Sequence, residues 1–248
     1  MLVSITNAST DKISRMTLIN NRRFNWFDFA NSAVGKKLIT GFTGLGLSFF
    51  VLFHLLGNLL ILSDRQAYNQ LAHWLENLHF VLYGVELLLL FLAALHIAIG
   101  IKIRLNTAQA RPASYKELKS AGQPSKQSLS SRSMAITGII IFGFLVWHLL
   151  SFKFGTYYAT TVEGVKMRDL SQLVIEKFHN PIYAFGYTGA IALVCLHLRH
   201  GIWSAAQSLG MLSSSNSSLV HKVSLVVAIL IGFGFSIVPL SIYFSAVL

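Results

Sequence analysis

The sequence has a single cysteine, Cys195, among its 248 residues. One thiol excludes a disulfide framework within the chain, and it leaves no thiolate cluster to hold zinc or an iron–sulfur centre. Any iron–sulfur cluster that works with this chain must therefore belong to a partner.

Charged residues are scarce as well. They make up 12% of the chain, whereas 54% of the residues are hydrophobic, a balance unfavourable for a soluble globular domain. The apolar residues gather in long uncharged blocks rather than at amphipathic spacing, which is typical of membrane spans. Residues 1–19 lack a continuous apolar core, so we expect no cleaved signal peptide.

Five apolar blocks each approach the roughly 20 residues that cross the hydrocarbon core. They are 38–62, 79–101, 134–152, 182–203 and 223–248. Because lipid offers no partners to backbone amides, each block must be a helix, and we expect Pro239 to kink the fifth. The predicted fold is an all-α integral membrane protein, a five-transmembrane-helix bundle over 38–248. It follows a cytoplasmic N-terminal segment, 1–37.

Acidic residues are fewer than basic ones, nine against twenty, and the formal charge is +11. The basic residues lie mainly between the apolar blocks, which favours contact with anionic lipid headgroups over nucleic-acid binding. Fifteen fall on one side: residues 12, 15, 22, 23, 36, 37, 102, 104, 111, 116, 119, 126, 132, 199 and 222. By the positive-inside rule the N-terminus and a loop at 102–133 are cytoplasmic, and the C-terminus lies outside the inner membrane. We expect no internal repeat.

Four blocks contain one histidine each, namely His54, His96, His148 and His197. An imidazole is costly in hydrocarbon, so each indicates either a function or a hydrogen bond between helices. Counting along the helices places His54 and His148 roughly 6–8 Å outward of the midplane, and the other two roughly 7–9 Å inward. This arrangement predicts two bis-histidine sites roughly 15 Å apart, as two axially ligated haems on a transmembrane electron path require.

Glycine provides room for a flat macrocycle beside its ligands. Gly100 and Gly201 each follow a histidine by four residues on the same helix face, and Gly57 follows His54 by three. We expect the porphyrin to approach the backbone at these positions.

His200 is the rival of His197 as a ligand. It lies nearer the cytoplasmic boundary, beside Arg199, which suits a propionate or headgroup contact better than iron. The other histidines, His73, His79, His179 and His221, fall at or outside the ends of the blocks, where water or headgroups satisfy them.

Several segments together resemble the cytochrome b subunit of succinate:quinone oxidoreductases, the succinate dehydrogenase and fumarate reductase membrane anchor. They are "GKKLITGFTGLGLSFFVLFHLLGNLLI", "LHIAIGIKIRL", "WHLLSF" and "CLHLRHGIWSAAQSLG". The likeness runs from about Phe29 to the C-terminus, is closest to the single-chain, five-helix, di-haem branch, and rests most specifically on the order of the four histidines.

The resemblance implies two haems b, with His96 and His197 on the proximal one and His54 and His148 on the distal one. It also implies two cytoplasmic partners, a flavoprotein subunit with covalent FAD and an iron–sulfur subunit. Electrons would pass between them and a membrane quinone in respiration and the tricarboxylic acid cycle. Whether the whole complex forms an oligomer stays open.

The resemblance further implies a menaquinone-type site near the distal haem, with an acidic residue near the outer face. Glu86, deep in its span, and Glu76, more accessible, are the candidates, although a carboxyl bonded to a neighbouring helix is an equal alternative for Glu86. One branch of the family has a glutamate where this chain has Cys195, so a proton pathway through that residue is not expected. Possible propionate partners are Lys36, Lys37, Arg104, Arg199 and His200.

Other readings differ in their sequence requirements. A di-haem cytochrome b of quinol:cytochrome c oxidoreductases carries two histidines on each of two helices, whereas here four helices carry one each. A non-redox transporter requires broken helices or polar groups at one midplane site. An intramembrane hydrolase would need a serine nucleophile near a histidine, and Ser48 and Ser151 stand in no such motif.

Overall fold

The computed structural model describes residues 25–109 and 129–245. The chain divides into two units, 1–36 and 37–248. In the first unit, the short helix α2 (Trp26–Asn31) begins at Asn25, whose side chain accepts a hydrogen bond from the Phe27 backbone. Everything that follows concerns the second unit unless stated.

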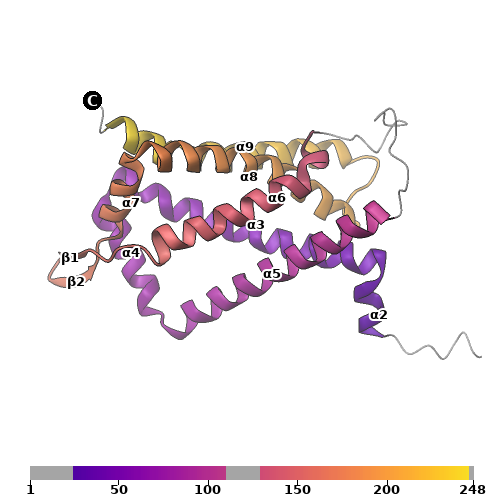
Figure 1. Ribbon diagram of the computed structural model, residues 1–248, viewed down its shortest axis with the longest axis horizontal. Helices are drawn as coiled ribbons and strands as arrows, with labels where there is room; N and C mark the ends of the chain where they lie inside the picture. The colour runs from indigo at the N-terminus through magenta and orange to yellow at the C-terminus, as the bar shows by residue number, and fades with distance from the viewer. Residues whose placement is uncertain (1–24, 110–128, 246–248) are drawn as a thin grey trace, which may run out of the picture. The chain divides into compact units, whose positions relative to one another are not determined.

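Within the described residues, five helices are long and apolar enough to cross a membrane: Ala33–Ser63, Phe80–Thr107, Ser133–Lys153, Pro181–Ser208 and Ser217–Ser245. They belong to α3 (Ala33–Ser63), α5 (Phe80–Gln109), α6 (Leu129–His148) with the π-helical turn η1 (Leu149–Lys153), α8 (Pro181–Ser208) and α9 (Ser217–Ser245) (Figure 1). The predicted five-helix membrane bundle is confirmed.

The helices extend beyond the predicted spans, and the predicted loop at 102–133 is too long. Helix α5 continues to Gln109 and α6 begins at Leu129, so 102–109 and 129–133 are helical. Hydropathy detects the hydrocarbon core, whereas a helix continues into the headgroup region for as long as its polar ends are solvated. The rest of the predicted loop lies outside the described residues.

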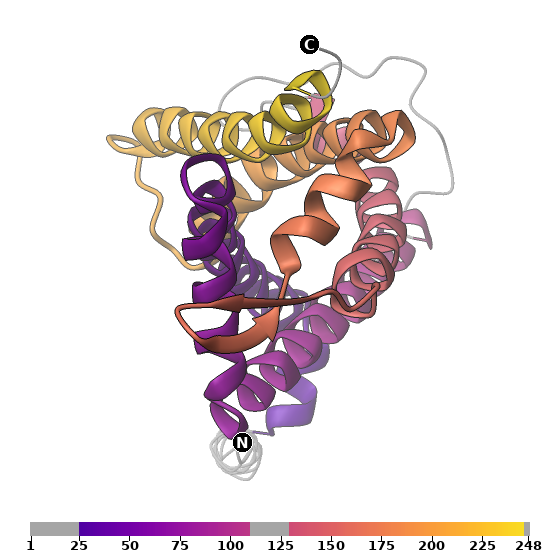
Figure 2. The same cartoon turned by 90° about the vertical axis from the view of Figure 1, so that its left-hand side faces the viewer.

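Extramembrane structure that hydropathy did not predict gathers at one end of the bundle, which we call the hairpin end. It contains α4 (Arg65–Asn77), the strands β1 (Ala159–Val162) and β2 (Val165–Arg168), and α7 (Leu170–His179), and it faces the reader in Figure 2. We call the opposite end, where α5 ends and α6 begins, the loop end. The hairpin adds two short strands to a fold that is otherwise helical over the described residues.

Local sequence signals explain each of these elements. Asp64 caps α4 by accepting from the backbone of Gln66 and Ala67. The strands pair antiparallel, and Glu163 (φ 51°) and Gly164 (φ 82°) form the two-residue turn between them, since both have the positive φ that such hairpins require.

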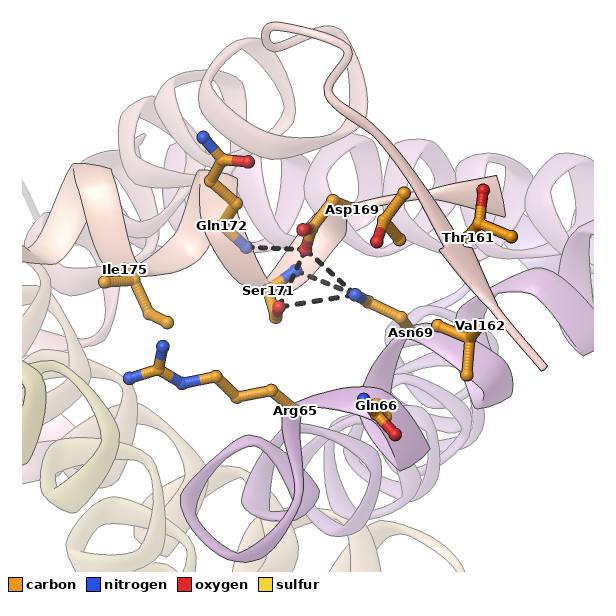
Figure 3. Close-up of a pocket in the computed structure, with 10 residues that line it drawn as sticks. Arg65, Gln66, Asn69, Thr161, Val162, Asp169, Ser171, Gln172 and Ile175 are labelled. Atoms are coloured by element: carbon orange, nitrogen blue, oxygen red, sulfur yellow. Dashed lines mark hydrogen bonds between the residues drawn. The ribbon is translucent and has the colours of Figure 1, made fainter. Parts of the chain in front are cut away.

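A buried polar network ties α4 to α7 (Figure 3). The Asn69 amide, 4% exposed, donates to Asp169 at 2.9 Å, while its oxygen accepts from the Ser171 backbone at 2.9 Å. Burial raises the pKa of Asp169, but hydrogen bonds from Gln172, Asn69 and Ser171 outweigh it, and the net pKa is lowered. The ionised carboxylate therefore stabilises the junction.

Helices α8 and α9 pack side by side, as both views show (Figures 1 and 2). The Cys195 thiol donates to the Ala228 carbonyl at 3.0 Å, and it occupies space that a side chain at position 232 would need. Gly232 thus permits the close approach of the helices. Pro239 lies inside α9 and is fully buried.

We predict that Asp169→Ala loosens the α4–α7 junction, because the buried Asn69 amide then loses the nearer of its two acceptors and keeps only Ser171 Oγ at 3.3 Å. Hydrogen exchange of α7 should become faster. The matched control is Thr160→Ala, because Thr160 lines a cavity next to this network. In the unaltered protein the protection should be complete above the ordinary aspartate pKa of 3.8 and fall as the pH drops through the lowered value. Protection of α7 that did not change with pH or with Asp169→Ala would contradict this role.

Candidate functional site

The four intramembrane histidines form two pairs of rings. His54 of α3 faces His148 of α6 with ring centroids 5.6 Å apart and planes at 85°. His96 of α5 faces His197 of α8 with centroids 6.3 Å apart and planes at 67°. We call the first the hairpin-end pair and the second the loop-end pair. Each pair draws its members from two helices.

The spacing of the pairs suits a shared axial metal. A metal–imidazole bond is about 2 Å long, so the centroids of two rings on opposite sides of one metal lie about 6 Å apart. Both pairs are near this value. Among the described residues no cluster of three or more His, Cys, Asp or Glu side chains could hold a metal.

The loop-end rings have their Nδ1 atoms engaged by threonines. His96 Nδ1 lies 3.2 Å from the Thr40 carbonyl and 3.2 Å from Thr43 Oγ1, and His197 Nδ1 lies 3.1 Å from Thr137 Oγ1. A carbonyl only accepts, so His96 Nδ1 carries the proton. Nε2 is then left with the lone pair that a metal takes.

The glycines next to the loop-end pair leave open space. A Cβ at Gly100 or Gly201 would meet nothing within 4 Å, as a cradle for a flat ring requires. Gly57 differs, because a Cβ there would lie 3.5 Å from a methyl group of Leu71. It is therefore a packing position against α4.

The hairpin-end pair has aromatic surroundings. Phe50 stacks on His54 with centroids 5.3 Å apart, and Phe144 and Phe152 lie 6.0 and 5.5 Å from the His148 ring. His148 Nδ1 is buried without a hydrogen-bond partner in the described part of the chain. This environment excludes water from both rings.

A polar link joins His54 to the hairpin end. The Asn58 amide donates to the His54 carbonyl at 2.7 Å and lies 3.4 Å from His54 Nδ1, and the Tyr68 hydroxyl donates to Asn58 at 3.3 Å. Burial raises the pKa of Tyr68 to about 12, so its hydroxyl stays protonated.

The predicted acidic candidates lie in different settings. Glu86 forms an ion pair with Lys153 in η1, five residues after His148, and Glu76 is exposed near the end of α4. Glu86 is thus bonded to a neighbouring helical segment, and its partner there is a charged side chain. Lys153 was not a candidate in the sequence, because its distance from Glu86 along the chain gave no signal.

The predicted propionate partners divide as well. The Arg199 guanidinium lies 3.5 Å from His221 Nε2 on α9, so it contacts the α8–α9 seam rather than the loop-end pair. His200 contacts the Trp203 ring at 6.2 Å and is not paired with His96. Lys37 and Arg104 are exposed, and Lys36, which belongs to the first unit, is half-buried.

Sequence reasoning missed an internal repeat. Thr-Gly followed eleven residues later by His occurs at 43–54 and again at 137–148, and both threonines contact a loop-end histidine. Eleven residues are about three helical turns, so the threonine and the histidine share one helix face. The expectation of no repeat was wrong, because this repeat resides in three positions and not in overall similarity.

A cavity of about 440 Å³ opens at the hairpin end between α4, β1 and α7. Its lining includes Arg65 together with Asn69, Asp169 and Ser171, and the last three belong to the network of Figure 3. No histidine lines it.

Comparison with known proteins gives one relative. The chain is 23% identical over 199 residues to the "Succinate dehydrogenase cytochrome b558 subunit" of Bacillus subtilis (strain 168), across 80% of this chain and 89% of the relative. The resemblance to succinate dehydrogenase cytochrome b subunits is confirmed. No protein-family model matches, and no solved structure matches with significance.

We predict that Lys153→Met lowers the melting temperature, since it leaves the Glu86 carboxylate without its partner at the membrane edge. The coupling should be up to about 1 kcal/mol, because both side chains are partly exposed. The double variant Glu86→Gln with Lys153→Met should recover part of the loss, and thermal unfolding of all four forms measures it. Strictly additive effects would show that the pair does not interact.

Proposed function

We propose that this chain is the membrane subunit of a succinate:quinone oxidoreductase and relays electrons between an iron–sulfur subunit and a membrane quinone. The two histidine pairs carry the proposal. Each pair matches the spacing of axial ligands on one metal, and the pairs lie at two levels of a five-helix bundle. The similarity to a succinate dehydrogenase cytochrome b subunit supports the assignment.

In this proposal His54 and His148 hold the distal haem b, and His96 and His197 hold the proximal one. Each bound haem supplies a one-electron carrier. The residues of this chain would do the rest. The histidine imidazoles would bind iron, through Nε2 in the loop-end pair, while Gly100 and Gly201 would admit the ring and Phe50, Phe144 and Phe152 would keep water away.

The levels of the pairs follow from the repeat. Thr43 contacts His96 and precedes His54 by eleven residues on the same helix, so the two pairs are separated by about 16 Å of helical rise. Two stacked carriers connect the two ends of the bundle, as electron transfer across a membrane requires.

Orientation and partners follow the charge bias. The loop end, flanked by the basic segment that follows α5, faces the cytoplasm in this proposal, together with the N-terminus, and the hairpin end faces outward. The flavoprotein and iron–sulfur subunits then dock at the loop end, next to the proximal pair. Cys195 alone cannot hold a cluster, which places the iron–sulfur centres in a partner.

The quinone, of menaquinone type, is proposed to bind near the distal pair. Glu86 is the preferred acidic residue, because it pairs with Lys153, which lies in the π-helical turn directly after His148. Glu76, at the exposed end of α4, is the candidate for exchange with water.

A histidine-lined transporter is less favoured. Within the described residues each span is one continuous helix, apart from the π turn at the end of α6, and transporters place substrate at broken helices.

We predict that the purified protein contains two haems and that each pair controls one. His54→Ala or His148→Ala should remove the distal haem, and His96→Ala or His197→Ala the proximal one, because a single imidazole does not hold haem b as a six-coordinate centre. Soret absorption and haem-to-protein ratio measure the loss.

His200→Ala and His221→Ala are matched controls, since both change a histidine at the loop end outside the pairs. Both should retain two haems. A folded protein without Soret absorption would overturn the proposal, as would loss of the proximal haem in His200→Ala but not in His197→Ala. Co-purification of a flavin-containing and an iron–sulfur-containing chain with the wild type and with His54→Ala would support the partner assignment.

A further inference from the structure

We propose that Thr43 and Thr137 are a matched pair of positioning residues that fix the loop-end histidines and lower the midpoint potential of the proximal haem. The inference rests on the proposed function, because the potential belongs to a haem held by His96 and His197. It assigns a role to two residues that bind neither iron nor quinone.

Both threonines are buried between helices. Thr43 and Thr137 are each 2% exposed, and each reaches from its own helix to a histidine on another: Thr43 from α3 to His96, and Thr137 from α6 to His197. The Oγ1–Nδ1 distances are 3.2 and 3.1 Å. A buried hydroxyl with such a partner is a second-layer contact of the kind that orients metal ligands.

The proton positions follow from the other contacts of the hydroxyls. Thr43 Oγ1 donates to the Ile39 carbonyl at 2.8 Å, and Thr137 Oγ1 donates to the Ser133 carbonyl at 3.0 Å. A hydroxyl has one hydrogen, and in both residues a carbonyl takes it. The oxygen is therefore an acceptor for Nδ1–H, which leaves Nε2 as the iron-binding nitrogen in both rings.

The following glycines let the helices come close enough for this contact. A Cβ at Gly44 would lie 3.0 Å from His96 Cε1, and a Cβ at Gly138 would lie 3.6 Å from His197 Cε1. The same dipeptide thus meets the same ring edge in both halves of the repeat. In each half, the threonine and the glycine after it therefore meet the same histidine ring. A threonine that only bonds to its own helix backbone would not explain this agreement.

The hairpin-end pair lacks this arrangement. His148 Nδ1 is buried without a partner among the residues that the structure describes, and His54 Nδ1 has only the Asn58 amide, a donor, at 3.4 Å. An acceptor on Nδ1–H increases the electron density that a histidine gives to iron and so favours the ferric state. The threonines should therefore lower the potential of the proximal haem relative to the same haem without them.

The two threonines are not equivalent. His96 Nδ1 also lies 3.2 Å from the Thr40 carbonyl, so Thr43→Val leaves one acceptor, whereas Thr137→Val leaves His197 with none that the structure shows. We predict that both variants raise the midpoint potential of the proximal haem, and that Thr137→Val raises it more. Thr137→Ser keeps the hydroxyl and should restore the wild-type value.

The test is a redox titration of the haem absorption bands in the purified protein. The electron paramagnetic resonance signal of low-spin haem is a second readout, which reports the orientation of the axial imidazole rings. Titrating each threonine variant also in the His54→Ala background leaves the proximal haem as a single transition. Thr188→Val is the control, because the Thr188 hydroxyl donates to the Ala184 carbonyl within α8 and hydrogen-bonds to no histidine among the described residues.

A raised proximal potential in Thr137→Val, a smaller rise in Thr43→Val and recovery in Thr137→Ser support the proposal. Unchanged potentials with both haems retained overturn it, as does an equal shift in Thr188→Val. If Thr137→Val loses the proximal haem, the proposal stands only when Thr137→Ser keeps it at the wild-type potential and Thr43→Val is shifted. A wild type without haem would instead overturn the proposed function.

Discussion

The structure depends on one constraint: an imidazole in hydrocarbon must satisfy two nitrogens with opposite needs. At the loop end a threonine on a neighbouring helix contacts Nδ1 of each histidine, and the two rings of the pair lie with centroids 6.3 Å apart. At this end the contacts join α3 to α5 and α6 to α8, because each threonine lies on a different helix from the histidine that it contacts. The histidine pairs then connect α3 to α6 and α5 to α8, so contacts of these four rings link all four helices.

Much of the fold could be predicted from composition, because the bilayer imposes a length and a hydropathy that five blocks meet. The helix ends could not, since Lys102 and Arg104 continue α5 into a region where hydropathy no longer reports on helix. The hairpin end was missed for a related reason. Its polar network joins Asn69 to Asp169 and Ser171, which lie 100 and 102 positions further along the chain. In the sequence these three residues look like ordinary loop residues.

Features of the candidate site that depend on spacing along one helix could be predicted from the sequence, whereas contacts between helices could not. Histidine depth and the His-to-Gly spacing are local counts, and they selected the residues whose rings the structure brings together. Contacts between helices have no such count, so Glu86 was assigned without Lys153 and Arg199 was directed toward propionates although it lies against His221. The threonines had a signal, the repeated Thr-Gly before each hairpin-end histidine, but it acquires meaning only once the facing helix is known.

The repeat divides the bundle into two similar parts, α3 with α5 and α6 with α8, and each histidine pair takes one member from each part. Neither part has a complete ligand set at either level. On the proposed function, haem insertion is therefore also an assembly step, because each bound haem links one part of the bundle to the other through its two histidines. Helix α9 has no counterpart in the repeat. It is joined to α8 by direct packing at Cys195 and Gly232, so its attachment does not depend on bound haem.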